Sequence, residues 1–109
     1  MKAKIVLVHF PFTDLTAAKL RPALVIHESD HDVIVAFISS RIPDHFVGSD
    51  LPVPASHPSF PGTGLKRDSV IKFDKVATVS KDLIEGEIGA VDDRLAEESN
   101  TILRRVFIF

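Results

Sequence analysis

The sequence predicts a mainly β fold, a small and strongly bent sheet or β-barrel with short helices and one C-terminal α-helix. Short runs of β-branched and aromatic residues alternate with polar or proline-containing turns over most of the chain, and helical spacing of apolar residues occurs only near its end. The 109 residues, 45% of them hydrophobic and none of them cysteine, suffice for one domain that core packing alone must stabilise. We therefore expect a single domain over residues 1–109.

The first two predicted strands enclose a polar loop. Ile5–Phe10 supplies β-branched and aromatic residues up to a proline, and a second apolar run includes Leu24–Ile26. The loop Thr13–Leu20 contains no glycine and is expected to be exposed and mobile, a common place for a substrate-gating segment. Arg21 follows it and precedes a proline, which favours an extended backbone at the arginine. A cation there is fixed at its base and free at its tip, although an isolated Arg-Pro pair is more often a plain surface feature.

A third strand is predicted at Val33–Ile38, where a nearly continuous apolar run indicates burial on both faces. The run follows a dense polar turn and ends in Ser39, Ser40 and Arg41. Two hydroxyl groups and a cation therefore stand where a buried strand emerges at an edge.

Residues 42–67 differ in composition from the rest, because they hold five of the seven prolines and three of the five glycines. Leu51–Val53 fits a short edge strand, and Pro54–Arg67 is expected to be an irregular loop. A long loop in a compact domain is usually functional or disordered. Its glycines precede a strand and not a helix, so the loop does not fit a dinucleotide-binding or Walker-type motif.

The next segments, Asp68–Phe73 and Lys75–Val79, are predicted strands that are close enough in sequence to form one bent strand. Ser80 can cap a short turn over Lys81–Ile84. Gly86–Val91 is a brief extended segment that precedes the C-terminal helix.

An α-helix is predicted near residues 93–106. Asp92 and Asp93 suit its start and Arg104 and Arg105 suit its end, because opposite charges complement the two ends of the helix dipole. Its apolar residues share one face: Leu95, Ile102, Leu103 and Val106.

The net charge of −2 argues against a surface that binds nucleic acid everywhere. Residues 1–81 carry ten Lys or Arg against eight Asp or Glu, whereas residues 82–109 carry three against seven. A nucleic-acid surface must therefore be a local patch on the first part of the chain.

The apolar run at the N-terminus is too short for a signal peptide or a membrane span, and cysteine is absent, so we expect a cytoplasmic protein with no membrane partner.

The sequence gives little support to metal or serine-hydrolase chemistry, and we expect no cofactor. None of the five histidines forms an H-x₃-H pair on a predicted helix or has a cysteine partner, and His31-Asp32 fits a turn better than a metal site. Neither Ser39 nor Ser40 lies in a nucleophile-elbow motif. The acidic pairs near the C-terminal helix fit a solvated helix face.

Four residues near predicted strand ends could act together on a phosphate: Arg21, Ser39, Lys72 and Asp74. A guanidinium group presents a fork of donors to two phosphate oxygens and stabilises charge that develops at phosphorus. Metal-free RNA cleavage needs such a cation, a proton acceptor for the attacking 2′-hydroxyl and a proton donor for the leaving oxygen. From spacing alone, this chemistry is one possibility among several.

The chain resembles the MazF/PemK family of toxin endoribonucleases, also called mRNA interferases, over nearly its whole length. The resemblance is carried, in order, by IVLVHFPFTD, KLRPALVI, VIVAFISS, TGLKRDSVIKFDKVATVSKDLI and EIGAVDD. It implies an SH3-like barrel of the MazF/PemK/CcdB type with a C-terminal helix, a homodimer, and metal-independent cleavage of single-stranded RNA. It also implies a cognate antitoxin partner and DNA binding by the toxin–antitoxin complex.

Matched residue by residue, the resemblance gives the family's catalytic arginine to Arg21 and its hydroxyl residue at the end of the third strand to Ser39. The basic residue and aspartate that act as acid and base in the PemK-like branch match Lys72 and Asp74. The residues expected to contact RNA are Phe12, Thr13, Asp14, Lys19, Ser40, Arg41, Lys66 and Arg67.

This chain departs from the family pattern at three places. His9 stands where aspartate is common, the loop before Arg21 lacks its usual glycine, and Lys72 replaces the more common arginine. Lysine cannot hold two phosphate oxygens in a fork.

Three function classes are open at this stage. The first is a sequence-selective endoribonuclease toxin. The second is a toxin of the same fold that poisons a protein such as gyrase, whose target contact typically involves a C-terminal tryptophan that this chain lacks. The third is a non-catalytic binding module that still binds an antitoxin. Incubation with a long RNA in chelator separates them.

Overall fold

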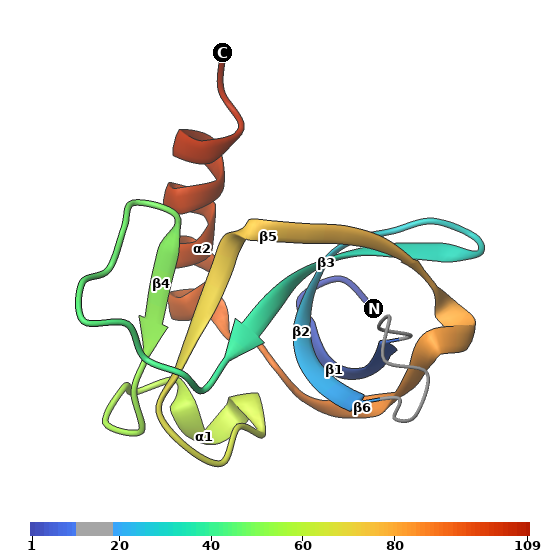
Figure 1. Cartoon of the computed structure of the whole chain (residues 1–109), viewed down its shortest axis with the longest axis horizontal. Helices are drawn as coiled ribbons and strands as arrows, with labels where there is room; N and C mark the ends of the chain where they lie inside the picture. Colours follow the sequence, from blue (N-terminus) through green and yellow to red (C-terminus); the bar gives the residue numbers. More distant parts are fainter. Residues whose placement is uncertain (11–18) are drawn as a thin grey trace.

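The protein consists of one strongly curled antiparallel sheet and a C-terminal helix (Figure 1). The computed structural model describes residues 1–10 and 19–109. In these residues six strands form one sheet in the order β4-β5-β3-β2-β1-β6. The strands are β1 (Lys4–Phe10), β2 (Lys19–Glu28), β3 (Asp32–Ser39), β4 (Asp50–Val53), β5 (Ser69–Ser80) and β6 (Ile84–Ala90). The helices are α1 (Phe60–Thr63), the 3-10 helix η1 (Lys81–Leu83) and α2 (Asp93–Val106). The predicted mainly β fold with one terminal helix is confirmed.

The sheet turns a corner within β5. Ala36 of β3 pairs with Val76, but its neighbour Phe37 pairs with Lys72, so residues 73–75 have no partner in the β3 ladder. Such an insertion bends a strand and increases its twist. Figure 1 shows β5 changing direction at this point and the strands curling into a ring. The prediction of one bent strand in this region is therefore confirmed.

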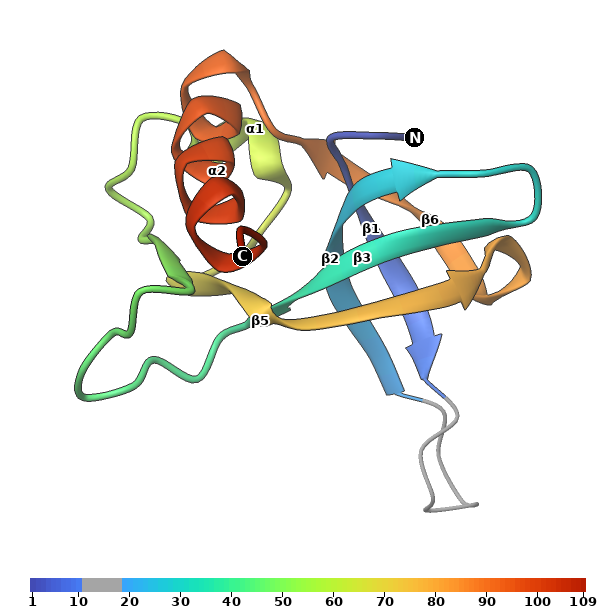
Figure 2. The ribbon, with the colours of Figure 1, turned by 90° about the horizontal axis from the view of Figure 1, so that it is seen from above.

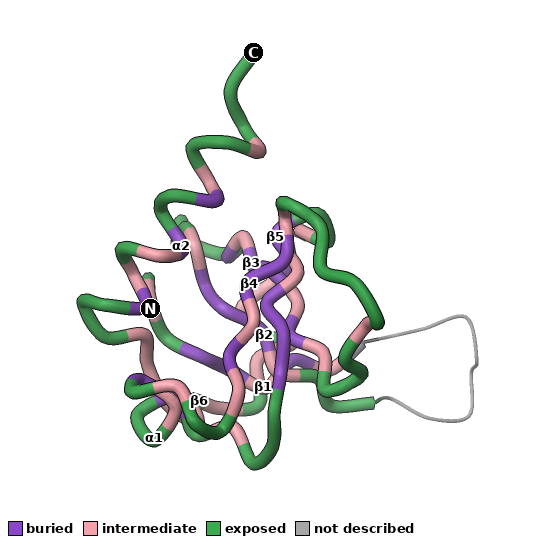
Figure 3. The backbone as a smooth tube through the Cα atoms, turned by 90° about the vertical axis from the view of Figure 1, so that its left-hand side faces the viewer, coloured by how far each residue is buried: buried purple, intermediate pink, exposed green. Residues whose placement is uncertain are grey.

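The curled sheet separates two apolar clusters. The first joins β1, β2, β3 and β5 largely through valines, and the second lies between the sheet and α2 through Leu95 and Ile102. β3 supplies Val33 and Val35 to the first cluster and Ala36 and Ile38 to the second, which confirms the predicted burial on both faces. Buried stretches follow the strands in Figure 3, while most of the connecting loops and the C-terminal tail are exposed.

The helix α2 begins and ends where the sequence predicts. Asp92 caps it, because its Oδ1 accepts the Leu95 N–H over 3.0 Å and the Ser59 hydroxyl over 2.7 Å. These hydrogen bonds, the Leu95 N–H foremost, lower the pKa of the Asp92 carboxyl. Figure 2 shows α1 and α2 together on one side of the curled sheet. None of the helices in the described part of the chain has the length and apolar character needed to cross a membrane.

The segment Pro54–Arg67 corrects one expectation, because it is not irregular throughout. It contains the helical turn α1, which starts with a proline at its first turn and ends at Gly64 in the left-handed conformation. The Pro and Gly residues that suggested a loop are thus the start and stop of a short helix.

Two strand boundaries also differ: β2 already includes Lys19 and Leu20, and β6 begins at Ile84. The predicted turn after Ser80 is confirmed as η1, with the Ser80 side chain accepting the Asp82 N–H.

Replacing Gly64 by alanine is expected to destabilise the fold, because Gly64 has φ +73° and a Cβ there would lie 2.0 Å from the Ile88 carbonyl oxygen. A strained left-handed residue costs about 1–3 kcal/mol, and the clash adds to it, so we expect a loss of at least about 2 kcal/mol in the free energy of unfolding. Gly86→Ala is the matched control, since a Cβ at Gly86 meets nothing within 4 Å. Urea denaturation of both variants measures the difference, and equal losses would contradict this account.

Candidate functional site

Two adjoining pockets lie along β2, β3 and β5, with volumes of about 450 Å³ and 690 Å³. They share Arg21 and Ile38, and we call them together the cationic groove. The first pocket is lined by Arg21, Phe37, Ile38, Ser39, Arg41, Pro43, Lys72 and Lys75. The second is lined by Leu7, Lys19, Leu20, Arg21, Pro22, Ile38, Ser40, Gly64, Leu65, Lys66, Arg67, Ser69 and Ile88.

The cationic groove gathers positive charge on a protein of negative net charge. Among the described residues that line it, seven are Lys or Arg and none is Asp or Glu. Six of these cations are the ones that the sequence singled out: Lys19, Arg21, Arg41, Lys66, Arg67 and Lys72. The seventh, Lys75, was missed; its only sequence signal is its place three residues after Lys72. The groove therefore has the charge that a polyanion requires.

Arg21 occupies the centre of the groove because it lines both pockets. It lies on β2 opposite Val8 of β1, and its side chain is exposed. Within the described residues, no carboxylate forms an ion pair with it. The strand thus fixes the backbone of Arg21, while its guanidinium group is open to an external anion.

Ser39 is the last residue of β3, and its hydroxyl lies beside the same pocket. Its Oγ accepts the Arg41 N–H over 3.1 Å, which turns the backbone of the following loop. The hydroxyl hydrogen is not used in that bond and can donate to a ligand. The neighbouring Ser40 lines the second pocket, so the two serines at the end of the strand border the two halves of the groove.

Lys72 is paired with a carboxylate that the sequence did not indicate. Its Nζ donates to Asp50 Oδ1 over 2.5 Å, and the Asp50 side chain is only 1% exposed. Burial by itself would raise the pKa of the Asp50 carboxyl, but the hydrogen bond and charge of Lys72, together with the Val47 N–H, outweigh burial and lower that pKa below its ordinary value. Asp50 stands 22 residues from Lys72 in sequence, so no local motif signals the pair.

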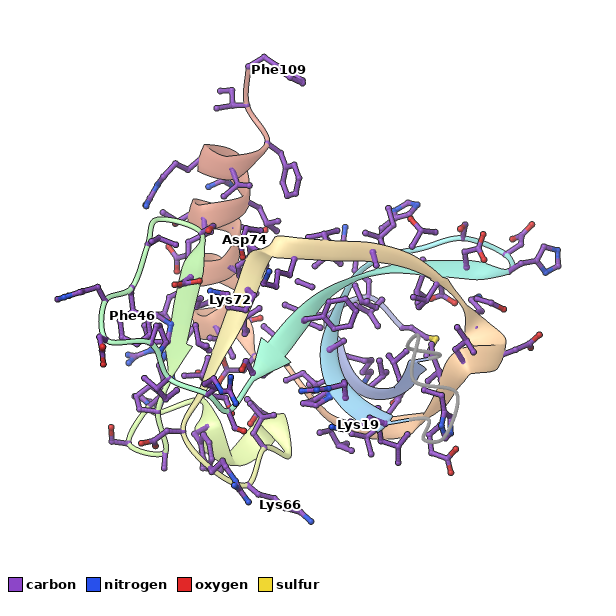
Figure 4. All side chains as sticks on the ribbon, in the orientation of Figure 1. Lys19, Phe46, Lys66, Lys72, Asp74 and Phe109 are labelled. Atoms are coloured by element: carbon purple, nitrogen blue, oxygen red, sulfur yellow. The ribbon has the colours of Figure 1, made fainter. Side chains whose placement is uncertain are left out.

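Asp74 lies apart from the groove. It is exposed, lines neither pocket, and sits at the corner of β5, above Lys72 in Figure 4. The structure thus brings Arg21, Ser39 and Lys72 together but leaves Asp74 at the margin. Three further residues expected to contact RNA, Phe12, Thr13 and Asp14, lie outside the described residues, as does most of the expected loop Thr13–Leu20.

Two histidines of the described residues contact glutamates. His9 Nε2 lies 2.6 Å from Glu85 Oε2, and His57 Nε2 lies 2.7 Å from Glu98 Oε1. His57 Nδ1 accepts the Ser59 N–H over 3.0 Å, so its other nitrogen is the one that donates to Glu98. Within the described part of the chain, no three His, Asp or Glu side chains gather closely enough to hold a metal ion.

The sequence matches the model of the PemK-like, MazF-like toxins of type II toxin–antitoxin systems over residues 1–107. The chain belongs to this toxin family. No curated protein matches it at a significant level. The match to the family model confirms the resemblance to the MazF/PemK family that the sequence motifs indicate.

Solved structures of toxins share the fold of this MazF-like chain. The Mycobacterium tuberculosis toxin MazF-mt6 superposes with a TM-score of 0.73 at 19% identity, covering 95% of both chains. A mycobacterial endoribonuclease in complex with its cognate antitoxin gives a TM-score of 0.72 at 14% identity, covering 96% of this chain and 91% of the other. A further Mtb toxin superposes with a TM-score of 0.68 at 19% identity, covering 93% of this chain and 99% of the other. The expected MazF-type barrel with a C-terminal helix is confirmed.

The Lys72→Met variant is expected to lose stability in a pH-dependent manner. Asp50 has a lowered pKa in the folded protein, so its pair with Lys72 stabilises the fold above the ordinary carboxyl pKa, and this stability is lost as the pH falls through the lowered value. Without Lys72 the buried carboxylate has no cation, which costs about 3 kcal/mol at pH 7.

Urea denaturation of wild type and Lys72→Met at pH 7 and at a pH below the ordinary carboxyl range measures this difference, which should shrink at the lower pH because the buried carboxyl group of the variant, with no cation beside it, takes up a proton. Lys75→Met is the control, since Lys75 is an exposed lysine on the same strand. A loss for Lys72→Met that is the same at both pH values would contradict the assignment.

Proposed function

We propose that this MazF-like toxin is a metal-independent endoribonuclease that cleaves single-stranded messenger RNA at selected sequences in the cytoplasm and is inhibited by a cognate antitoxin. One observation carries the proposal: six further cations surround an exposed arginine in a groove whose described lining has no carboxylate. A polyphosphate backbone is the ligand that fits such a surface. The family is one of toxins, and two structural neighbours are named endoribonucleases.

In the proposed reaction the RNA 2′-hydroxyl attacks the adjacent phosphorus and the bond from phosphorus to the 5′-oxygen breaks. The 2′-hydroxyl gives up its proton as it attacks and the leaving 5′-oxygen takes up one proton, so the products are a 2′,3′-cyclic phosphate and a 5′-hydroxyl. Arg21 stabilises the negative charge that develops on the phosphorane oxygens, because its exposed fork matches two oxygens. Ser39 donates its hydroxyl hydrogen to a phosphate oxygen from the same pocket.

Lys72 and Asp74 take the acid and base roles that the family resemblance implies. Lys72 lines the first pocket beside Arg21, so it can donate to the leaving oxygen or to the phosphate. Asp74 is exposed at the corner of β5 and would act on a substrate that extends beyond the first pocket. The remaining cations and Ser40, with Phe12, Thr13 and Asp14 from the preceding loop, hold the RNA on either side.

We further propose that the antitoxin occupies the same groove and that the protein is a homodimer. An acidic, unfolded antitoxin segment with a few apolar anchors could bind the cations in place of RNA. Two copies would double the cationic surface. Exposed apolar side chains that suit association occur on the β3–β4 loop and the C-terminal tail: Ile42, Phe46, Val47, Phe107, Ile108 and Phe109. DNA binding would belong to the toxin–antitoxin complex.

A non-catalytic binding module is the second candidate. It is favoured by the absence of an acidic or imidazole side chain among the described residues that line the groove, since such a group would serve as a general base. Such a module would bind RNA or antitoxin through the same cations without cleaving the RNA.

Arg21→Ala is expected to abolish RNA cleavage while the melting temperature stays nearly unchanged, because an exposed cation contributes little to folding. The assay uses a long single-stranded RNA in excess EDTA, and product ends are identified as 2′,3′-cyclic or 3′-phosphate with 5′-hydroxyl. Arg104→Ala, on the exposed face of α2, is the control and should cleave like the wild type.

Several outcomes of this assay would contradict the proposal. Cleavage by folded Arg21→Ala would remove its assigned role, and strict dependence on Mg²⁺ or 5′-phosphate ends would exclude attack by the 2′-hydroxyl. RNA binding by the wild type without cleavage would instead favour the binding module.

The double variant Lys66→Glu/Arg67→Glu is expected to weaken RNA and antitoxin binding together by roughly tenfold or more, because both ligands would meet the same cations. Binding of each ligand, and competition between them, is measured by fluorescence anisotropy at two salt concentrations, and both affinities should fall as salt rises. Arg94→Glu/Arg104→Glu makes the same charge change on α2 and should leave both affinities unchanged. Loss of RNA binding with unaltered antitoxin affinity would show that the two ligands use different surfaces.

A further inference from the structure

Lys72 faces the groove while its ammonium group is bound to a buried carboxylate behind it. Asp50 lies opposite Lys72 in the β4–β5 ladder, and the two form an ion pair of 2.5 Å. Lys72 lines the first pocket, whereas Asp50 lines neither pocket and its side chain is 1% exposed. Asp50 can therefore influence a bound substrate only through Lys72.

The Asp50 carboxylate is itself fixed in place. Its Oδ2 accepts the Val47 N–H over 3.1 Å, while the Asp50 N–H donates to the Val47 carbonyl over 3.0 Å. One residue before it, the Ser49 carbonyl accepts the Phe73 N–H over 2.9 Å, which joins this turn to the corner of β5. Each carboxylate oxygen thus has its own donor, Lys72 for one and Val47 for the other. The group that holds Lys72 is part of the rigid fold.

A lysine benefits from a carboxylate that holds its ammonium group, because its side chain is flexible. An arginine presents its donors in a planar fork, whereas a lysine is a point charge at the end of a flexible four-carbon stem. An ammonium group has three N–H donors, so one bond to Asp50 leaves two for a ligand. A bond to a buried carboxylate also removes much of the freedom of the stem before any substrate arrives, and groups ordered in advance catalyse better.

We propose that Asp50 is a positioning residue for RNA cleavage: it holds the Lys72 ammonium group at the wall of the first pocket, with two N–H donors directed to a phosphate group of the bound RNA. This inference rests on the proposed endoribonuclease function and deepens it. Asp50 compensates here for the loss of the planar fork that an arginine at position 72 would supply.

The first test measures the order of Lys72 without any reaction. In wild type, the Nζ of Lys72 is expected to give a resolved ammonium ¹H–¹⁵N signal at low temperature, because the bond to Asp50 slows hydrogen exchange. Asp50→Asn, which has the same shape but no charge, should lose this signal. Asp44→Asn, an exposed aspartate on the loop before β4 that lines neither pocket, should keep it.

The second test is a kinetic double-mutant cycle on a defined RNA. Asp50→Asn should lower kcat by at least about tenfold with little change in KM, since displacement of a catalytic group acts mainly on the reaction step. Adding Asp50→Asn to Lys72→Met should cause no further loss, because Asp50 acts through Lys72. Should Asp50→Asn fail to fold, Asp50→Glu keeps the charge but displaces it by one methylene and should also lower kcat in a folded protein.

The outcomes separate this inference from the proposed function. Wild-type kcat in folded Asp50→Asn, or losses that add in the double variant, would overturn the positioning role. Retention of the Lys72 signal in Asp50→Asn would overturn it as well. Absence of cleavage by the wild type would instead reject the endoribonuclease function, and the Lys72 signal would still decide whether Asp50 orders the lysine.

Discussion

The corner of β5 at residues 73–75 determines how the rest of the structure is arranged. Before the corner β5 lies between β4 and β3, and after it β5 pairs with β3 alone. The fully buried Phe73 ring and the hydrogen bond from its N–H to Ser49 hold the corner in place. Without this change of direction the sheet would not curl around its valine cluster, and Lys72 would not lie where β4 and the groove meet. Fold and candidate site therefore depend on the same three residues.

The same geometry explains how a protein of net charge −2 maintains a cationic groove. The carboxylates of the described residues lie outside the lining of the groove: on α2, on β6, in turns, at the far ends of β2 and β3, at the corner of β5 as Asp74 does, or buried behind the groove as Asp50 is. Burial removes Asp50 from contact with the groove while its charge still acts on Lys72. Charge within about one Debye length of a bound phosphate matters most, so the local arrangement outweighs the net value.

The proline-rich segment between β4 and β5 is held against the start of α2 by polar contacts. His57 pairs with Glu98, and the Ser59 hydroxyl donates to Asp92, so α1 and α2 are linked by residues distant in sequence. Gly64 then packs directly against the Ile88 backbone of β6. These contacts fix the point from which Lys66 and Arg67 reach the groove. A segment with the composition of a loop thus supports part of the cationic groove.

The sequence by itself determined the class of fold, the helix at 93–106, the bent strand and the identity of most of the cations, because apolar periodicity, caps and residue type are local properties. It also singled out Arg21, whose position after a loop and before a proline is readable from neighbours. Only the tertiary structure decided that α1 interrupts the expected loop and that Lys72 is paired with Asp50, while the nearby Asp74 stays outside the groove. The reason is physical: the corner of β5 and its pairing with β4 are long-range contacts, and they bring together charges 22 residues apart that no local pattern connects.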